Sequence, residues 1–300
     1  MGLLVRGMLG LGDCIRQRCI IRQWLKTDEI WLETSWPCLY HDFGSKLHFV
    51  NYNGTLRTQT KNANREKHLM ELPPPGLVRK EIRMMHAAIS LQGSMLGAML
   101  YYAKCDKNDY DFSIPVPIAW HDKVDAILDG KNLDRKPIMF YRPLVVRTEW
   151  RNSRPRNPDY KAYDKLLNLI RDRYFIISVA DLQPGIEWIV GEPFKADLEF
   201  HGGELDCEML IALAKQSSLV FAAPGFATVM AQAVGTPSVC IYGGHETPQA
   251  HSLYLKTAPH LSIVPIKPCA CFTSSHMCDK TIDITKAETD LLQFCDGLHG

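Results

Sequence analysis

Residues 3–24, "LLVRGMLGLGDCIRQRCIIRQW", decide how the first part of the chain folds. Residues 3–6 form a short apolar run typical of a buried strand. Glycines follow at 7, 10 and 12, and residues 14–25 have the apolar spacing of a helix. Asp13 is therefore expected at the turn where a strand passes into a helix. A carboxylate there can cap the helix by accepting its first free amides, or it can serve as a catalytic base. The residues leave both roles open.

Glycine and arginine surround this carboxylate in the sequence. Gly12 has no side chain, so a substrate can approach the backbone closely at this point. Arg16 falls on the first turn of the expected helix, where it can meet an anionic group in the same site. Arg18 and Arg22 are expected to lie on a solvated face of the helix.

The composition is that of a globular protein with two domains. The 300 residues are 46% hydrophobic and carry a net charge of +1, which requires neither a nucleic-acid nor a membrane partner. Arg6 and Asp13 interrupt the first apolar stretch, so no secretory signal is expected. Residues 219–242 are the most apolar, but prolines and glycines break them, so no transmembrane segment is expected. These features predict a cytoplasmic protein.

Strand-like and helix-like segments alternate, which predicts an α/β fold with parallel sheets. The first half has expected strands at 3–6, 29–34 and 46–52, a polar basic loop at 53–68, and a long helix at about 79–104. The second half has expected strands at 138–147, 174–180, 218–223 and 237–242, with helices at 159–171, 204–216 and 226–234. The polar segment 129–137 separates the two halves. We expect Rossmann-like domains at 1–134 and 135–300, with the ligand in a central cleft that their sheets face.

Three groups of residues in the second half are candidates for binding an anionic ligand. The turn Pro224-Gly225 precedes a helix that begins near Phe226, and free amides at a helix start attract anions. A plain strand–helix connection would have the same pattern. Arg147, Arg151 and Arg154 cluster after an expected strand, where they are either phosphate ligands or ordinary surface residues. Glu187 and Glu204 follow later strands and can hold ribose hydroxyls, although helix capping competes for the second region.

These motifs resemble those of glycosyltransferase family 9, the heptosyltransferase-like enzymes of GT-B fold. The matching segments are "VRGMLGLGD" (5–13), "LIALAKQSSLVFAAPGFATVMAQAVGTPSVCIYGG" (210–244) and the cysteine-containing "PCACFTSSHMCDK" (268–280). The resemblance implies that Asp13 is the catalytic base and that Arg147 or Arg151 contacts donor phosphate. It also implies that Glu187 contacts ribose, and that the helix start at Gly225 and Phe226 holds the pyrophosphate.

One segment departs from the family pattern. The family's usual Asp-(Ser/Thr)-Gly-x-x-His is "APGFAT" (223–228) in this chain, without the aspartate and the histidine. In this respect the chain looks more like a divergent branch common in bacteriophages, which includes enzymes resembling the DNA arabinosyltransferases. The resemblance then implies an inverting transfer from a nucleotide-sugar donor to an acceptor hydroxyl, with hydroxymethylated cytosine in DNA as the favoured acceptor.

The expected acceptor side combines Gly12 and Arg16 with the basic loop that contains Arg57 and Lys61. Such a patch suits DNA phosphates or lipopolysaccharide phosphates, and a solvated loop explains it as well. Synthesis of a surface saccharide is therefore the alternative function. A non-catalytic nucleotide-sugar-binding protein is a further alternative, favoured by the missing aspartate and histidine. No cofactor is expected, because fixed positive groups can replace a metal ion at the leaving diphosphate.

The chain has 10 cysteines, most of them inside apolar runs, where a reduced thiol acts as a small hydrophobe. Four potential metal ligands lie close together near the C-terminus: Cys269, Cys271, His276 and Cys278. They either bind zinc as a Cys₃His set or are ordinary reduced side chains. No metal ion is included in the predicted functional site.

Overall fold

The computed structural model describes residues 2–52, 54–131, 136–152, 154–252, 258–272 and 276–299. The chain forms two compact units. Unit 1 comprises Met1–Pro115 with Gln249–Tyr254, and unit 2 comprises Val116–Pro248 with Leu255–Gly300. The sequence had suggested a boundary between residues 134 and 135, and residues 132–135 lie outside the described part. Helix α6 (Ile118–Leu128) packs against α8 (Cys207–Gln216), so it belongs to unit 2.

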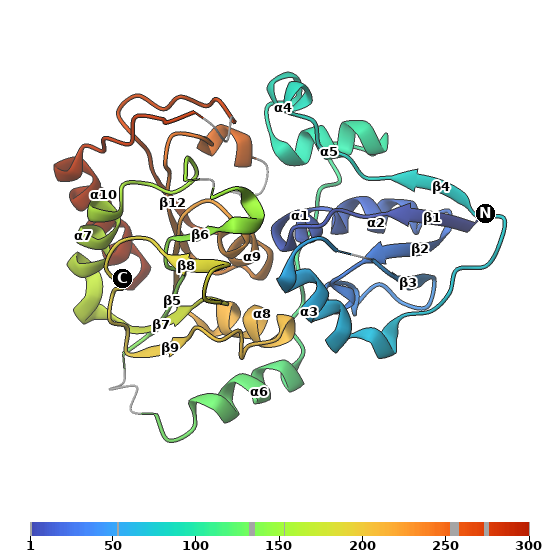
Figure 1. Cartoon of the computed structure of the whole chain (residues 1–300), viewed down its shortest axis with the longest axis horizontal. Coiled ribbons are helices and arrows are strands. Elements are labelled where there is room, and N and C mark those ends of the chain that lie inside the picture. The colour runs from blue at the N-terminus through green and yellow to red at the C-terminus, as the bar shows by residue number, and fades with distance from the viewer. Residues whose placement is uncertain are drawn as a thin grey trace. The chain divides into compact units, whose positions relative to one another are not determined.

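Unit 1 contains a parallel sheet whose described strands run in the order β3-β2-β1-β4 (Figure 1). The strands are β1 (Gly2–Arg6), β2 (Glu29–Thr34), β3 (Leu47–Asn51) and β4 (Val78–Glu81). The helices are α1 (Leu11–Arg16), α2 (Arg18–Trp24), α3 (Arg57–Arg65), α4 (His86–Gln92) and α5 (Met95–Ala103), with the 3₁₀ turns η1 (Pro37–Tyr40) and η2 (Lys67–Leu69). The predicted parallel pairing of the first strands is confirmed.

The glycine-rich turn after β1 differs from the prediction of one helix over 14–25. The helical segment begins at Leu11 and is divided at Gln17 into α1 and α2. The Gln17 side chain accepts a bond from the Met8 amide (2.7 Å) and donates to the Tyr40 hydroxyl (2.5 Å). Gly7 allows this packing, because a Cβ there would lie 2.9 Å from the Glu33 carbonyl oxygen and 3.0 Å from the Gln17 amide nitrogen.

Two further expectations for unit 1 were wrong. The segment 53–68 is not a plain loop, since it contains α3. The segment 79–104 is not one helix, because it starts as the exposed edge strand β4 and continues as α4 and α5. Gly93, in the left-handed region at φ +76°, ends α4. The Ser94 side chain then caps α5 by accepting the Gly97 amide.

Unit 2 contains a parallel sheet whose described strands run in the order β12-β11-β10-β5-β7-β9. They are β5 (Ile138–Tyr141), β7 (Phe175–Val179), β9 (Leu198–Phe200), β10 (Leu219–Ala222), β11 (Ser238–Ile241) and β12 (His260–Ile263), beside an antiparallel ribbon of β6 (Val145–Arg147) and β8 (Glu187–Ile189). The remaining helices of unit 2 are α7 (Tyr160–Ile170), α9 (Phe226–Val234) and α10 (Ile284–His299), with the 3₁₀ turns η3 (Thr148–Trp150) and η4 (Arg171–Arg173). The 3₁₀ turn η5 (Pro248–His251) lies in unit 1 except for its first residue.

In chain order, the strands of this sheet follow the 3-2-1-4-5-6 arrangement of doubly wound folds. Helices α7 and α10 lie on one side of the sheet, and α8 and α9 lie on the other (Figure 1). Between α7, α10 and the sheet, the core is apolar and aromatic and includes Tyr163, Leu166, Ile176, Phe221 and Leu291. None of the helices in the described part of the chain has both the length and the apolar composition needed to cross a bilayer.

The strand predicted over 138–147 is divided, and the division matters for the site. Strand β5 ends at Tyr141, and β6 begins at Val145 in a different sheet. Pro143 lies between them, and proline cannot continue a central strand because it lacks the amide donor. The helix predicted from residue 204 begins later, at Cys207, where the Asp206 side chain caps it.

Candidate active site

The carboxylate of Asp13 lies at the topological switch point of unit 1. Strand β1 pairs with β2 on one side and with β4 on the other, and ligands of α/β sheets bind at the carboxyl end of such a strand. Asp13 is in the first turn of α1, whose N-cap is Gly10, so the capping role considered for Asp13 is wrong. Its side chain is 28% exposed. The carboxylate is thus anchored in the turn and reachable from solvent.

Two buried side chains hold Asp13 in place. Arg16 donates from Nη1 to Asp13 Oδ1 at 2.7 Å, and its Nη2 lies 2.9 Å from His251 Nδ1. Arg16 and His251 are both almost fully buried. The other oxygen, Asp13 Oδ2, faces Gly10, where a Cβ would lie only 3.2 Å away. One oxygen is therefore fixed by a charged hydrogen bond, and the other borders a residue without a side chain.

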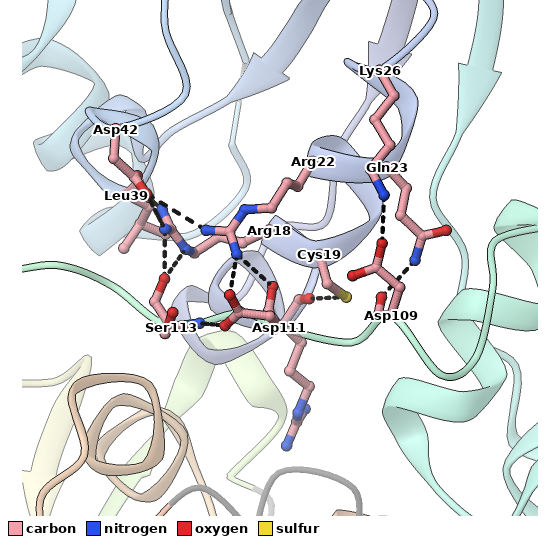
Figure 2. Close-up of polar contacts among 11 residues, drawn as sticks. Arg18, Cys19, Arg22, Gln23, Lys26, Leu39, Asp42, Asp109, Asp111 and Ser113 are labelled. Atoms are coloured by element: carbon pink, nitrogen blue, oxygen red, sulfur yellow. Dashed lines mark hydrogen bonds and ion pairs between the residues drawn. The ribbon is translucent and has the colours of Figure 1, made fainter.

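Arg18 and Arg22 do not form a solvated helix face, as the sequence had suggested. Figure 2 shows both side chains in a polar cluster with Asp42, Asp111 and Ser113. Arg18 is fully buried and binds both carboxylate oxygens of Asp42, at 3.0 and 2.9 Å, together with the Ser113 carbonyl. Burial lowers the pKa of the Arg18 guanidinium, and the Asp42 carboxylate acts in the opposite direction. The observed partners of these arginines are groups of unit 1 itself, so their role in the structure is to join parts of that unit.

The switch point of unit 2 carries positive charge. Strand β5 pairs with β7 and with β10, so the segments that leave β5 and β10 begin side by side. Arg142 follows β5 directly, and Pro224 and Gly225 form the turn after β10. Helix α9 starts at Phe226 without a side-chain cap. The Arg142 guanidinium lies 5.4 Å from the centre of the Phe226 ring, which brings a fixed cation next to the helix start.

A buried carboxylate joins two arginines at this edge. Glu187 has no exposed side-chain surface and pairs with Arg142 (3.0 Å) and Arg147 (2.9 Å). Arg147 and Glu187 are opposite each other in the β6–β8 ribbon. Burial lowers the pKa of Arg142, and the negative charge of Glu187 raises it. The three side chains carry one net positive charge. The predicted contact of Glu187 with ribose stays a prediction, and its observed partners are these two arginines.

The other predicted site residues lie in loops of unit 2 and in helices of unit 1. Arg151 is exposed and adopts a left-handed conformation (φ +53°) after η3. Glu204 is exposed and accepts the Gly202 amide at 2.9 Å. Gly12 is part of α1, adjacent to Asp13. Arg57 and Lys61 lie one helical turn apart on α3.

Sequence reasoning missed Arg142, Arg156 and His251. Arg156 pairs with Glu246 (2.8 Å) and donates to the Pro224 carbonyl at 3.3 Å, so it lies at the β10–α9 turn. The position of Arg142 directly before Pro143 was a usable signal, because a proline marks a strand end. For His251, no local pattern existed, since it meets Arg16 across 235 residues of chain.

The cysteines divide into two kinds. Burial raises the pKa of both Cys19 and Cys240 to about 12, so these thiols remain protonated and pack as apolar groups. In contrast, Cys269, Cys271, His276 and Cys278 bring their potential ligand atoms within 4.8 Å of one another. None of the ten cysteines, all of which lie in the described part of the chain, forms a disulfide bond.

Two units, each with a parallel sheet and helices, define the fold class of the GT-B glycosyltransferases. The solved structure of the Escherichia coli ADP-heptose lipopolysaccharide heptosyltransferase II is similar over 100% of both chains, with a TM-score of 0.61 and 12% identity. TibC from enterotoxigenic E. coli H10407, described as an iron-containing dodecameric glycosyltransferase, has a TM-score of 0.62 and 11% identity over 99% of this chain and 76% of its own. A family 9 glycosyltransferase from Veillonella parvula has a TM-score of 0.55 and 12% identity, over 97% of each chain.

These similarities concern the fold, because the identities are low. No protein-family model and no curated protein sequence matches the chain. The predicted GT-B fold is confirmed, and the structural neighbours are family 9 enzymes and heptosyltransferases, as the resemblance of the motifs implied.

Proposed function

We propose that this protein is a glycosyltransferase that moves a sugar from a nucleotide-sugar donor to an acceptor hydroxyl. The observation that carries the proposal is the Asp13 carboxylate, held by Arg16 at the carboxyl end of β1 and still 28% exposed. The GT-B fold supports it, because the similar structures are those of heptosyltransferases. A protein that only bound nucleotide sugars through the arginines of unit 2 would not need a positioned carboxylate in unit 1.

Asp13 is the proposed general base. It takes the proton of the acceptor hydroxyl as the acceptor oxygen bonds to the anomeric carbon from the face opposite the leaving group. The bond from that carbon to the diphosphate oxygen breaks, and its electron pair leaves with the diphosphate. The transfer therefore inverts the anomeric centre. Arg16 keeps the carboxylate oriented, and His251 keeps Arg16 oriented.

The proposed donor site is the positively charged edge of unit 2. Arg142 and Arg147 outnumber Glu187 by one charge. The first amides of α9, at Gly225 and Phe226, belong to the helix start whose Phe226 ring lies 5.4 Å from the Arg142 guanidinium. Fixed positive groups stabilise the charge that builds up on a departing diphosphate. This arrangement supports transfer without a metal ion at the diphosphate. Pro224, Arg151 and Glu204 are further proposed donor contacts, the last one to ribose.

The acceptor that we favour is a saccharide, because the heptosyltransferase II of similar fold is named for lipopolysaccharide. One observation keeps hydroxymethylated DNA as a second candidate. The basic residues Arg57, Lys61 and Arg65 recur every four positions on α3, which places them on one face of that helix. Such a row suits a polyanion.

The experiment is a screen of nucleotide sugars followed by transfer assays. A donor that binds the folded protein stabilises it by an amount that grows with the logarithm of the donor concentration divided by its dissociation constant, and this raises the melting temperature. The donors that do so are then incubated with a core oligosaccharide and, separately, with DNA containing hydroxymethylcytosine, and the mass of each acceptor is measured. A gain of one sugar mass supports the proposal and identifies the acceptor class. Stabilisation by nucleotide sugars without any mass gain would instead indicate a binding protein.

A further inference from the structure

Four side chains near the C-terminus converge on one point in unit 2. His276 Nδ1 lies 3.3 Å from Cys269 Sγ, 3.4 Å from Cys271 Sγ and 3.7 Å from Cys278 Sγ. The sulfur atoms of Cys271 and Cys278 are 3.6 Å apart. Every pair of these potential ligand atoms is within 4.8 Å. One histidine nitrogen is thus surrounded by three sulfur atoms.

These separations fit a tetrahedral zinc ion. With zinc–sulfur bonds of about 2.3 Å and zinc–nitrogen bonds of about 2.0 Å, tetrahedral angles place two sulfurs about 3.8 Å apart and a sulfur and a nitrogen about 3.5 Å apart. The four contacts given above differ from these values by a few tenths of an ångström, and the other pairs lie within 4.8 Å. Three thiolates and one imidazole are the soft donor set that zinc prefers.

The backbone around the ligands is bent and tied down. Ala270 and Phe272, on either side of Cys271, have φ angles of +54° and +53°, a left-handed conformation that is unfavourable for a non-glycine residue. The amides of Cys269 and Ala270 donate to the Gly244 carbonyl at 3.1 and 2.8 Å. The bends direct successive side chains inward, so the Cys-x-Cys pair can contribute both sulfurs to one ion.

A buried histidine lies beside the ligands. His245 is almost fully buried, and its Nδ1 is 3.9 Å from Cys271 Sγ. Its carbonyl also accepts the Phe272 amide at 3.3 Å. Three thiolates bound to Zn²⁺ leave one net negative charge, which an imidazole N–H donor beside a sulfur stabilises. Groups outside the ligand set commonly orient and tune metal ligands in this way.

We propose that Cys269, Cys271, His276 and Cys278 bind one zinc ion in a closed structural site. All four positions come from the protein, so no position remains for water or substrate, which distinguishes structural from catalytic zinc. The ion fixes residues 269–272 and 276–278 against the loop at Gly244 and His245, directly after β11. The next residue, Glu246, pairs with Arg156, which contacts the turn before α9. The zinc ion therefore braces this turn. Zinc binding at these side chains is independent of whether the protein transfers a sugar.

The test is the metal content of the purified full-length protein, measured by mass spectrometry of the elements, with a count of free thiols after denaturation in chelator. We expect about one zinc per chain, little iron, and all ten thiols free. The variants C271S and C278S should each retain less than about a tenth of the zinc. C105S, which removes a thiol far from the cluster in sequence and located in unit 1, should retain all of it.

Three results would overturn the proposal: zinc well below one equivalent in the wild-type protein, iron at one equivalent in its place, or two thiols lost to a disulfide. The metal and thiol content of the wild-type protein tests the proposal even if C271S or C278S does not fold. Replacing the bound metal with cobalt(II) gives a second readout, because tetrahedral cobalt thiolates absorb visible light. We expect this absorption in wild-type protein and C105S, and its loss in C278S.

Discussion

Replacing Arg18 by methionine tests whether its buried ion pair stabilises unit 1. The substitution keeps an unbranched apolar stem and removes the guanidinium group, which bonds to Asp42, to the Ser113 carbonyl and to the Leu39 carbonyl. Two carbonyls then lose a partner in the protein interior, at about 1–3 kcal/mol each. The Asp42 carboxylate still has Arg22 at 3.5 Å and remains partly exposed to solvent, so the loss of its bonds to Arg18 costs less than it would for a fully buried carboxylate. We expect a total loss of about 3–5 kcal/mol, as for other broken buried pairs.

The matched control is R22M, which removes the same kind of side chain one turn later on α2. Arg22 is 31% exposed and its partner Asp111 is 58% exposed, so this change should cost at most about 1 kcal/mol. Hydrogen exchange of peptides that cover β2 reports on unit 1 alone. For R18M, a loss of 3 kcal/mol corresponds to exchange about a hundredfold faster for the slowest amides. Equal effects of the two substitutions would refute the argument that burial sets the difference.

Two smaller changes test other parts of the fold. E187Q leaves Arg142 and Arg147 without their carboxylate partner, so the free energy of unfolding of unit 2, measured in urea, should fall by about 3 kcal/mol. A decrease below about 1 kcal/mol would contradict the assignment of Glu187 as their charge partner. S94A removes the cap that accepts the Gly97 amide at 3.0 Å and should cost about 1 kcal/mol, seen as faster exchange at the start of α5; unchanged exchange would contradict this assignment.

Much of the fold follows from local pattern. The apolar runs of β2, β7 and β10, and the periodic helices α7 and α9, were predicted to within two residues because burial on a parallel sheet requires those patterns. The pattern failed where short elements meet. Strand β4 is exposed along its whole length, so no apolar pattern marks it in the sequence. Strands β5 and β6 were predicted as one strand because Pro143 between them was not taken as a strand end.

The candidate site shows the same division. Asp13 could be located from the sequence because a glycine-rich turn precedes it. The partners that orient it, and those that surround Arg142, come from distant parts of the chain and have no local signature. The burial of Arg18 was missed for this reason too, because its ligands are carbonyls and a carboxylate 21 to 95 residues away.

The central claim is that Asp13 is the base in sugar transfer, and D13N tests it most directly. Asparagine keeps the shape of the side chain but cannot accept the proton. Turnover of the donor and acceptor found in the screen should fall by about 10²–10⁴, while the donor still raises the melting temperature as it does for the wild type. D109N, which alters an exposed ion pair with Lys26 in the same unit, should keep full turnover. Transfer by D13N at the wild-type rate would contradict the account.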